Sequence, residues 1–509
     1  MNIIFTVLSI FIVWAIILYL IKRGGKQYGL EVMGPLLAWK TEKGKKFIDN
    51  ISKNKIWKHY GNISILLCIG AMILTIYLIL LNVIIAFQIP PERAPSPRLI
   101  LGIPGINPAI PIGYGILALA IAIIIHEFSH GILARFGKVK IKSLGLLFLI
   151  FPIGAFVEPD EEQLKKVSRL KRSRVFAAGP ASNIIVAVIC ILLLSFVFSP
   201  LINSKTSGVI LENDIGDVSK WSIITEIDGN EISNVVDFKR IENNLTAGKF
   251  YNITFFKKGY ETKRIIFGAY VGNVVKGSPA EESGLKKGYV LYRISRSNGS
   301  VELKSWEDFY KALNSTKAGE KIWIAYYFND SYSNISVILA DKFSFTNDEE
   351  DKGKGFLGIG AYGIEDVIRN TEFYKNMLNP LKIEPFDSVK TKFFSFISLP
   401  FSGLSPLPDD LASLYTPPKI FWIIYNIIYW VFWLNFAIGT FNALPIMPLD
   451  GGYIFKDGVS FTIYKINRRI KDNKLEKISS TITTIVSVII FLSLLSIIVV
   501  PRLRSIISF

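Results

Sequence analysis

Charged residues, cysteine and histidine are all scarce in this sequence. Only 19% of the 509 residues are charged against 50% that are hydrophobic, and this balance excludes an ordinary soluble protein. The two cysteines, Cys68 and Cys190, both lie in apolar runs, which excludes a disulfide framework and a cysteine-rich zinc site. The mean hydropathy of +0.38 predicts an integral membrane protein instead.

The net charge of +17 does not indicate a nucleic-acid partner. Residues 201–420 hold 27 Lys and Arg against 28 Asp and Glu, whereas the rest of the chain holds 31 against 13. The excess therefore lies in short loops beside apolar spans, as membrane orientation requires and a nucleic-acid groove does not. We expect the lipid bilayer as a partner and no nucleic acid.

Six apolar runs reach the roughly 20 residues that a helix needs to cross a bilayer. They are Ile3–Ile21, Ile63–Phe87, Ile112–Phe136, Val175–Phe198, Ile420 to about Leu449, and Ile478–Val500. The loops after the first, third and fifth runs carry ten, nine and seven Lys or Arg, but loop 88–111 carries two. Basic loops stay in the cytoplasm. We therefore predict a multi-pass cell-membrane protein, a polytopic α-helical bundle with residues 200–418 outside the cytosol.

One further apolar stretch, Ser143 to Pro159, is too short to cross the membrane and is interrupted by Gly145, Pro152 and Gly154. Both of its ends lie among basic residues assigned to the cytosol. We predict a re-entrant hairpin, whose backbone must be satisfied by protein or by a wet cavity. The alternative is a surface loop with one apolar face.

The long external segment contains an internal repeat of 71 residues. Asp237-Phe238 and Ala247-Gly248 recur as Asp308-Phe309 and Ala318-Gly319, each between apolar strand-like runs. Residues 271–341 resemble a PDZ domain. In that family a small-residue loop, here Gly277 to Gly284, precedes a helix and a strand edge that binds the carboxyl terminus of a peptide. Residues 206–270 are a degenerate copy, whose peptide binding stays open.

Two of the three histidines lie four residues apart in HEFSH, His126 to His130, directly after the apolar run ILALAIAIII. On a helix they share a face, so both imidazoles can bind one ion while Glu127 accepts a proton from water. Paired histidines could instead hydrogen-bond between helices. That alternative does not explain the carboxylate between them, which costs a few kcal/mol in lipid.

A catalytic zinc takes three protein ligands and a water. The remaining histidine, His59, borders a basic loop and is not a candidate, so the third ligand must be Asp, Glu or Cys. Cys190 is one candidate, although it lies in the apolar half of its helix. Asp450 is the better candidate because it closes the fifth run in NALPIMPLDGG, where prolines end the helix and glycines let the backbone approach. His126 lies about 21 Å into the third run, so His126 and Asp450 both fall toward the cytosolic side.

HEFSH in one span and NALPIMPLDGG in a later one, with PDZ-like domains between them, resemble the site-2 protease family of intramembrane zinc metalloproteases. The resemblance implies zinc ligation by His126, His130 and Asp450, with Glu127 as general base. It also implies regulated cleavage of transmembrane helices whose external domain has been trimmed by another, site-1-type protease.

Further positions match family motifs that are associated with substrate binding. They are Gly179 and Asn183 in the sequence GPASN, and Asn442 upstream of the aspartate. For either asparagine, hydrogen bonding between helices is an equal alternative. The sequence does not indicate which asparagine stabilises the oxyanion.

The predicted organisation has six parts. They are 1–60 (first transmembrane helix and basic loop), 61–200 (HExxH helix, hairpin and GPxxN helix), 206–270 and 271–341 (PDZ-like domains), 342–418 (linker with short amphipathic elements), and 419–509 (LDG helix and final helix).

Two other functions remain open. A metalloprotease of a different class would draw its third ligand from a downstream glutamate, but Glu158, Glu161 and Glu162 lie in a polar loop that suits this role poorly. A non-enzymatic scaffold with PDZ domains, or a transporter with a structural metal, would not need Glu127.

Overall fold

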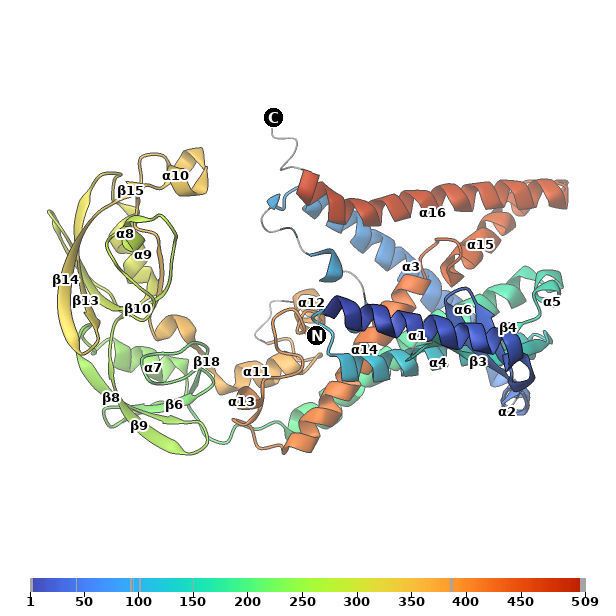
Figure 1. The fold of residues 1–509 in the computed structure, drawn as a ribbon, viewed down its shortest axis with the longest axis horizontal. Coiled ribbons are helices and arrows are strands. Elements are labelled where there is room, and N and C mark those ends of the chain that lie inside the picture. The colour runs from blue at the N-terminus through green and yellow to red at the C-terminus, as the bar shows by residue number, and fades with distance from the viewer. Residues whose placement is uncertain are drawn as a thin grey trace. The chain divides into compact units, whose positions relative to one another are not determined.

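The structure is a computed structural model. It describes residues 3–42, 44–91, 94, 96–99, 102–149, 151–384 and 388–503. The chain forms two compact units, as Figure 1 shows. One consists of Met1–Leu194 with Ile423–Phe509, and the other of Ser195–Trp422. The first unit combines long helices with one sheet, and the second is rich in β-structure.

Among the described residues, five helices are long and apolar enough to cross a membrane. They are α3 (Ile56–Ala86), α4 (Ile112–Phe136), α6 (Arg169–Leu193, with further turns to Leu201), α14 (Lys419–Asn442) and α16 (Asp472–Leu503). These five match the second to sixth predicted runs, which supports a membrane protein. The first run forms helix α1 (Ile3–Gly24), but its role as a sixth span stays a prediction.

The helices around the site pack through small side chains. Ala122 of α4 and Ala177, Ala178 and Ala181 of α6 are fully buried. In a membrane the hydrophobic effect does not drive helices together, so they associate through close packing, and small residues let two helix backbones approach closely. Large apolar side chains remain exposed on outer faces, as with Leu66 of α3 at 73%, which suits contact with lipid.

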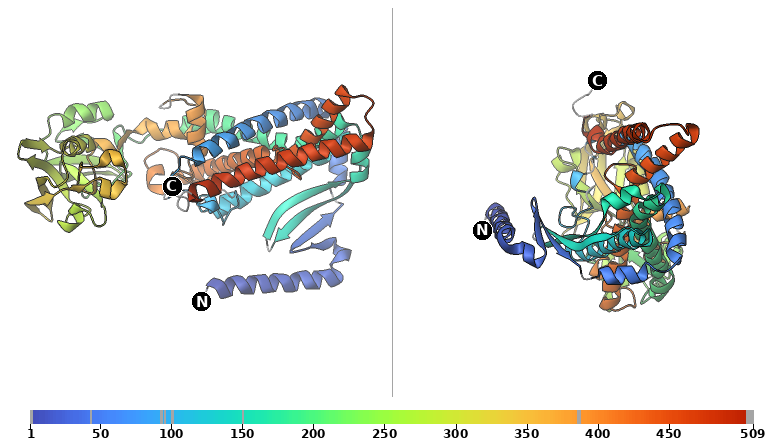
Figure 2. Two further views of the ribbon diagram at one scale, coloured as in Figure 1. Left: turned by 90° about the horizontal axis from the view of Figure 1, so that it is seen from above. Right: turned by 90° about the vertical axis from the view of Figure 1, so that its right-hand side faces the viewer.

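The predicted hairpin lies in a four-stranded antiparallel sheet of order β1-β2-β3-β4 (Figure 2). Its strands are β1 (Leu30–Met33), β2 (Leu36–Thr41), β3 (Ile141–Leu149) and β4 (Phe151–Pro159). The apolar stretch thus forms extended strands rather than a surface loop, while its depth in a bilayer stays a prediction. Residues 1–60, predicted to hold the first transmembrane helix and a basic loop, also contain β1 and β2, which extend the sheet. β4 is left as an edge strand.

The fifth span ends earlier than predicted. α14 stops at Asn442 rather than near Leu449, and a new helix, α15 (Asp450–Ile466), begins at the aspartate itself. Pro445 explains the early stop, because proline has no N–H to continue the helical hydrogen bonds. The first unit also contains two short helices, α2 (Lys45–Ile51) and α5 (Glu161–Lys166).

The second unit contains two six-stranded antiparallel β-sheets and a two-stranded one. The first has the order β18-β5-β6-β8-β9 with β7 on β6, and the second has the order β14-β13-β11-β10-β17 with β12 on β11. The strands of the first are β5 (Val209–Leu211), β6 (Ile223–Ile227), β7 (Asn230–Glu231), β8 (Phe250–Phe256), β9 (Tyr260–Ile266) and β18 (Ile368–Asn370). Those of the second are β10 (Ala269–Val274), β11 (Val290–Arg296), β12 (Gly299–Glu302), β13 (Lys321–Phe328), β14 (Ser331–Ile338) and β17 (Ile359–Tyr362).

Each of the two larger sheets, with the helix beside it, forms a domain that contains one copy of the sequence repeat. The repeated residues have the same roles in both domains. Phe238 on α7 (Val235–Glu242) is 0% exposed, and Phe309 on α9 (Trp306–Asn314) is 3% exposed. Gly248 and Gly319 follow these helices with φ of 84° and 79°, a left-handed conformation that favours glycine. Each domain therefore places one buried phenylalanine and one tight turn in the same order.

The expectation of a linker over residues 342–418 is corrected in part. β17 and β18 lie in this region and add a strand to each sheet, through pairing with β10 and β5. β16 (Gly355–Phe356) pairs with β15 (Ala340–Asp341), which lies just before this region. The helices here are short, namely α10 (Phe343–Thr346), α11 (Thr371–Leu378), α12 (Val389–Ile397) and α13 (Asp409–Ala412).

The loop that begins at Gly277, which the PDZ resemblance places before the peptide-binding helix and strand edge, is closed by its own hydrogen bonds. The Gly277 N–H donates to the Glu281 carboxylate at 2.7 Å, and the Glu281 N–H donates to Ser278 Oγ at 3.4 Å. The loop thus caps the short helix α8 (Pro279–Glu282). Because an acidic group already occupies the Gly277 N–H, this loop does not offer that donor to a second carboxylate.

Candidate metal centre

Two imidazoles on α4 face the same side of the helix. His126 and His130 are one turn apart, and their ring centroids lie 4.7 Å from each other. Their side chains are 8% and 12% exposed. The apolar run before them keeps α4 regular, so the four-residue spacing brings both rings to one point.

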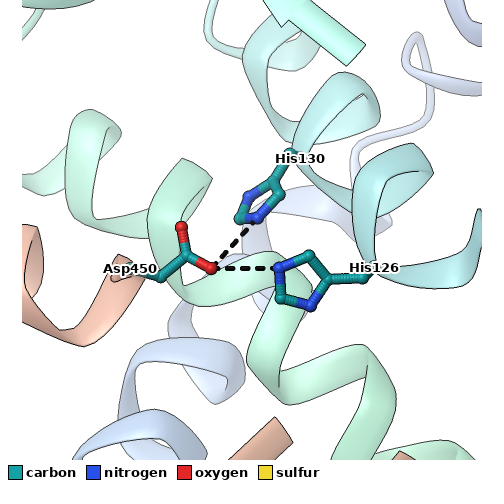
Figure 3. A group of neighbouring side chains, drawn as sticks. All are labelled: His126, His130 and Asp450. Carbon is teal, nitrogen blue, oxygen red and sulfur yellow. Dashed lines mark hydrogen bonds and ion pairs between the residues drawn. The ribbon is translucent and has the colours of Figure 1, made fainter. Parts of the chain in front are cut away.

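Asp450 reaches this point from the other end of the sequence. Its Oδ2 lies 3.1 Å from His126 Nε2 and 3.3 Å from His130 Nε2, as Figure 3 shows. The carboxylate is the first residue of α15, where the positive end of a helix dipole favours an anion. Three potential ligands from two distant segments therefore meet at a largely buried position.

The loop before Asp450 is packed so closely that two glycines are required. A Cβ at Gly451 would lie 2.0 Å from the Ala443 carbonyl oxygen, and one at Gly452 would lie 2.7 Å from the Ile446 carbonyl oxygen. Ser487 of α16 fixes the same loop, because its hydroxyl accepts a hydrogen bond from the Met447 N–H at 3.1 Å. These contacts hold Asp450 at the histidines.

The geometry of the three residues fits zinc. Two ligand atoms at about 2.05 Å from zinc and at the tetrahedral angle lie about 3.3 Å apart. The distances from Asp450 Oδ2 to the two Nε2 atoms are 3.1 and 3.3 Å, and all three ligand atoms lie within 4.8 Å of one another. Two imidazoles and one carboxylate are also a known donor set for catalytic zinc.

α6 orients the second histidine and leaves room for both. His130 Nδ1 donates to the Val175 carbonyl oxygen at 2.7 Å, which leaves the Nε2 lone pair for a metal. A Cβ at Gly179 would lie 2.4 Å from His130 Nε2 and 2.7 Å from His126 Nε2. Gly179, which was expected near the substrate, thus packs directly against the two rings.

Glu127 lies beside the cluster and contacts the sheet edge. Its Oε2 accepts a hydrogen bond from the Val157 N–H of β4 at 3.2 Å. This N–H points away from β3, because it is directed at α4. The carboxylate that the sequence selects as a general base therefore lies where the cluster meets the free edge of β4.

The two asparagines lie in different environments. Asn183 is fully buried, and its amide nitrogen donates to the Ala122 carbonyl oxygen of α4 at 3.4 Å. This contact links two helices, which was the alternative to substrate binding. Asn442 is half-buried at the last residue of α14, just before the loop that leads to Asp450.

The other residues considered as a third metal ligand have different surroundings. Cys190 is 11 residues beyond Gly179 on α6, which is about 16 Å along a helix. Glu158 accepts a hydrogen bond from Ser143 Oγ at 2.5 Å, and Glu161 forms an ion pair with Lys165 at 3.7 Å. Within the described part of the chain, the cluster formed by His126, His130 and Asp450 is the one group of this kind.

Several contacts of the site had no clear signal in the sequence. The Val175 carbonyl is a backbone group, and any residue could provide it. Ser487 is one of several serines in an apolar helix, so its contact with the loop could not be distinguished from a local hydrogen bond.

The comparison with protein families agrees with this geometry. The model of peptidase family M50 matches residues 114–490, which is well over half of the chain. This chain belongs to peptidase family M50. The resemblance to site-2 proteases predicted from HEFSH and NALPIMPLDGG is therefore confirmed at the family level.

Two relatives show how far this similarity extends. An uncharacterized protein of Methanocaldococcus jannaschii is 35% identical over 255 residues, which cover 48% of this chain and 66% of that protein. The zinc metalloprotease RasP of Shouchella clausii is 25% identical over 181 residues, which cover 35% of this chain and 39% of that protein. Both matches span less than two thirds of the relative. The match to RasP, together with the M50 membership, supports a metalloprotease that uses zinc.

Proposed function

We propose that this protein is an intramembrane zinc endopeptidase that cleaves transmembrane segments of other membrane proteins. One observation carries the proposal. His126 and His130 of α4 meet Asp450 of α15 at distances that suit zinc, and Glu127 lies next to them. The two histidines lie on a helix long enough to cross a membrane, and Asp450 follows the loop after another such helix. Membership in family M50 supports the same class of activity.

The chemistry is shared between the metal and Glu127. A bound zinc ion would supply a Lewis acid that polarises a peptide carbonyl and acidifies water. Glu127 takes the proton from the attacking water and passes it to the leaving amine. The Nδ1–H of His130 donates to the Val175 carbonyl oxygen, so the Nε2 lone pair of His130 would be free to hold the zinc ion.

Substrate binding uses the edge of β4. The backbone groups of a transmembrane helix are paired within the helix, so local unwinding must precede cleavage. An unwound segment can then pair with β4 as an added strand. Since the Val157 N–H already reaches Glu127, such a strand would lie beside the catalytic carboxylate.

An amide donor next to the cleaved bond would stabilise the oxyanion by about 3 kcal/mol. We assign this role to Asn442 rather than to Asn183, because the amide of Asn183 already donates to Ala122. We assign Gly179 to the packing of the two imidazoles.

We further propose that the basic loops lie in the cytosol, that the cluster lies toward the cytosolic side, and that residues 200–418 lie outside. The two β-domains, with PDZ-like organisation, would then admit substrates whose external part an upstream site-1-type protease has removed. The repeated placement of Phe238 and Phe309 supports two related domains.

Glu127→Gln tests the proposal most directly. We expect the variant to keep one zinc per chain but to cleave a model transmembrane helix about 10²- to 10⁴-fold more slowly. Zinc is measured by elemental analysis and cleavage by gel assay in reconstituted membranes. Glu162→Gln, at an exposed position on α5, is the matched control and should keep both properties. Unchanged cleavage by Glu127→Gln would refute Glu127 as the general base, whereas a wild-type protein that binds zinc but cleaves nothing would support a non-enzymatic scaffold or transporter instead.

A further inference from the structure

A cavity of about 720 Å³ lies between the four-stranded sheet and the helices α5, α6, α15 and α16. Its wall includes Phe156 and Val157 of β4, Phe176 of α6 and Tyr453 of α15. Pockets of 300–1,000 Å³ are typical of small-ligand or short-peptide sites. All of these elements belong to the first unit.

The floor of the cavity is one helical turn from the metal cluster. Phe176 directly follows Val175, whose carbonyl holds His130, and Tyr453 is three residues after Asp450. The two rings stack with centroids 4.3 Å apart and an interplanar angle of 6°. One turn of a helix rises about 5.4 Å, so Tyr453 lies within one turn of the ligand Asp450 on α15, and Phe176 is adjacent on α6 to the carbonyl that orients His130.

The sheet wall connects the cavity to the catalytic carboxylate. Val157 lines the cavity and donates its N–H to Glu127. Phe156 lies on the face of the sheet over Gly145, where a Cβ would be 2.4 Å from its ring. A strand added to β4 would therefore have one set of side chains directed over this aromatic surface.

The charged residues around the cavity are already paired. Arg172 donates to the Asp457 carboxylate, Lys456 forms an ion pair with Glu476, and Lys40 forms one with Glu158 at 3.6 Å. A side chain that enters the cavity thus meets aromatic rings rather than unpaired charges. Burial of a charged group there would carry a desolvation cost without a free partner.

We propose that this cavity binds the substrate residues that follow the cleaved bond toward the basic loops. Within the cavity, Phe176 and Tyr453 select a bulky apolar side chain of the substrate. The proposal rests on the proposed protease function and adds a specificity-determining pair to it. The preferred substrate is a transmembrane segment with leucine, methionine or phenylalanine at that position.

The test uses the full-length protein in lipid nanodiscs and a series of transmembrane substrates. Each substrate carries alanine, leucine or phenylalanine at one of the first four positions on that side of the cut. At one position, we expect the wild-type kcat/KM to be about tenfold higher for leucine or phenylalanine than for alanine. In Phe176→Ala this ratio should fall to about twofold or less. Tyr453→Leu should lower it independently, and Phe176→Tyr should restore it.

Phe196→Ala is the matched control, because Phe196 is 68% exposed near the end of the same span. This variant should keep the wild-type ratio. Damage to the fold lowers kcat/KM for all substrates equally, so an unchanged ratio in both Phe176→Ala and Tyr453→Leu overturns the proposed subsite alone. A wild-type protein that holds zinc but cleaves no substrate of the series overturns the protease function itself.

Discussion

At the residue scale, the metal cluster depends on the absence of one side chain. Gly179 lies where a Cβ would be 2.4 to 2.7 Å from both imidazoles, closer than such contacts allow. We expect Gly179→Ala to displace the rings and to lower zinc affinity at least about tenfold, in line with other changes next to metal ligands. Zinc content after dialysis against a graded chelator measures this loss.

Gly458→Ala is the control for this prediction. Gly458 lies within α15, and a Cβ there would meet nothing within 4 Å. Alanine in a helix interior is favoured over glycine by roughly 1 kcal/mol, so this variant should keep its zinc and its stability. Equal zinc affinity in both variants would contradict the tight packing around the cluster.

The sequence predicted which residues meet, but not how they are held. The HEFSH spacing brings His126 and His130 together on any regular helix, and NALPIMPLDGG indicated a backbone that could approach them. The place of Gly179 depends on where α4 and α6 approach each other, which small residues on both helices permit but which the sequence alone does not locate. Its contact with the rings was therefore not predicted, and its expected contact with substrate stays a prediction.

At the element scale, the free edge of β4 is the feature that a substrate would use. Successive N–H groups of a strand alternate in direction. Because the Val157 N–H points away from β3 to Glu127, the Ala155 N–H points away from β3 as well. Ala155→Pro removes that donor and leaves the bonds between β3 and β4 in place.

We expect Ala155→Pro to reduce cleavage of transmembrane substrates about fivefold or more, since a hydrogen bond and the fit of the added strand are lost. Zinc content should stay unchanged. Ala155→Val keeps the N–H at the same position and should cleave at close to the wild-type rate. If proline and valine behave alike in the cleavage assay, strand addition at this edge is wrong.

The elements that the sequence missed share a physical cause. Gly145, Pro152 and Gly154 exclude a continuous helix and so predicted the hairpin. β1 and β2 are short strands in a highly charged region, and the sequence does not show that β2 pairs with β3, about 100 residues later, or that β1 then pairs with β2. β17 and β18 are similar, since each is completed by a partner strand at least 80 residues earlier in the chain.

At the scale of the whole molecule, the charge balance separates the two units. The first unit carries the basic excess and the apolar helices, whereas residues 201–420 have nearly equal numbers of basic and acidic residues. This composition suits a water-exposed domain between membrane segments. The separation was visible in the sequence, because it depends on composition alone and not on the details of packing.

The function proposed for the β-domains leads to a prediction on the whole chain. Deletion must cover residues 206–370, because an end at 341 would leave β17 and β18 without their partner strands. If the domains filter substrates, the deleted protein should cleave untrimmed substrates at a rate close to that of trimmed ones, which the intact protein should prefer. Cleavage of both forms in the same reconstituted membranes measures this ratio. The Glu127→Gln version of the deletion controls for other proteases. Domains that act only as a spacer would leave the preference for trimmed substrates unchanged.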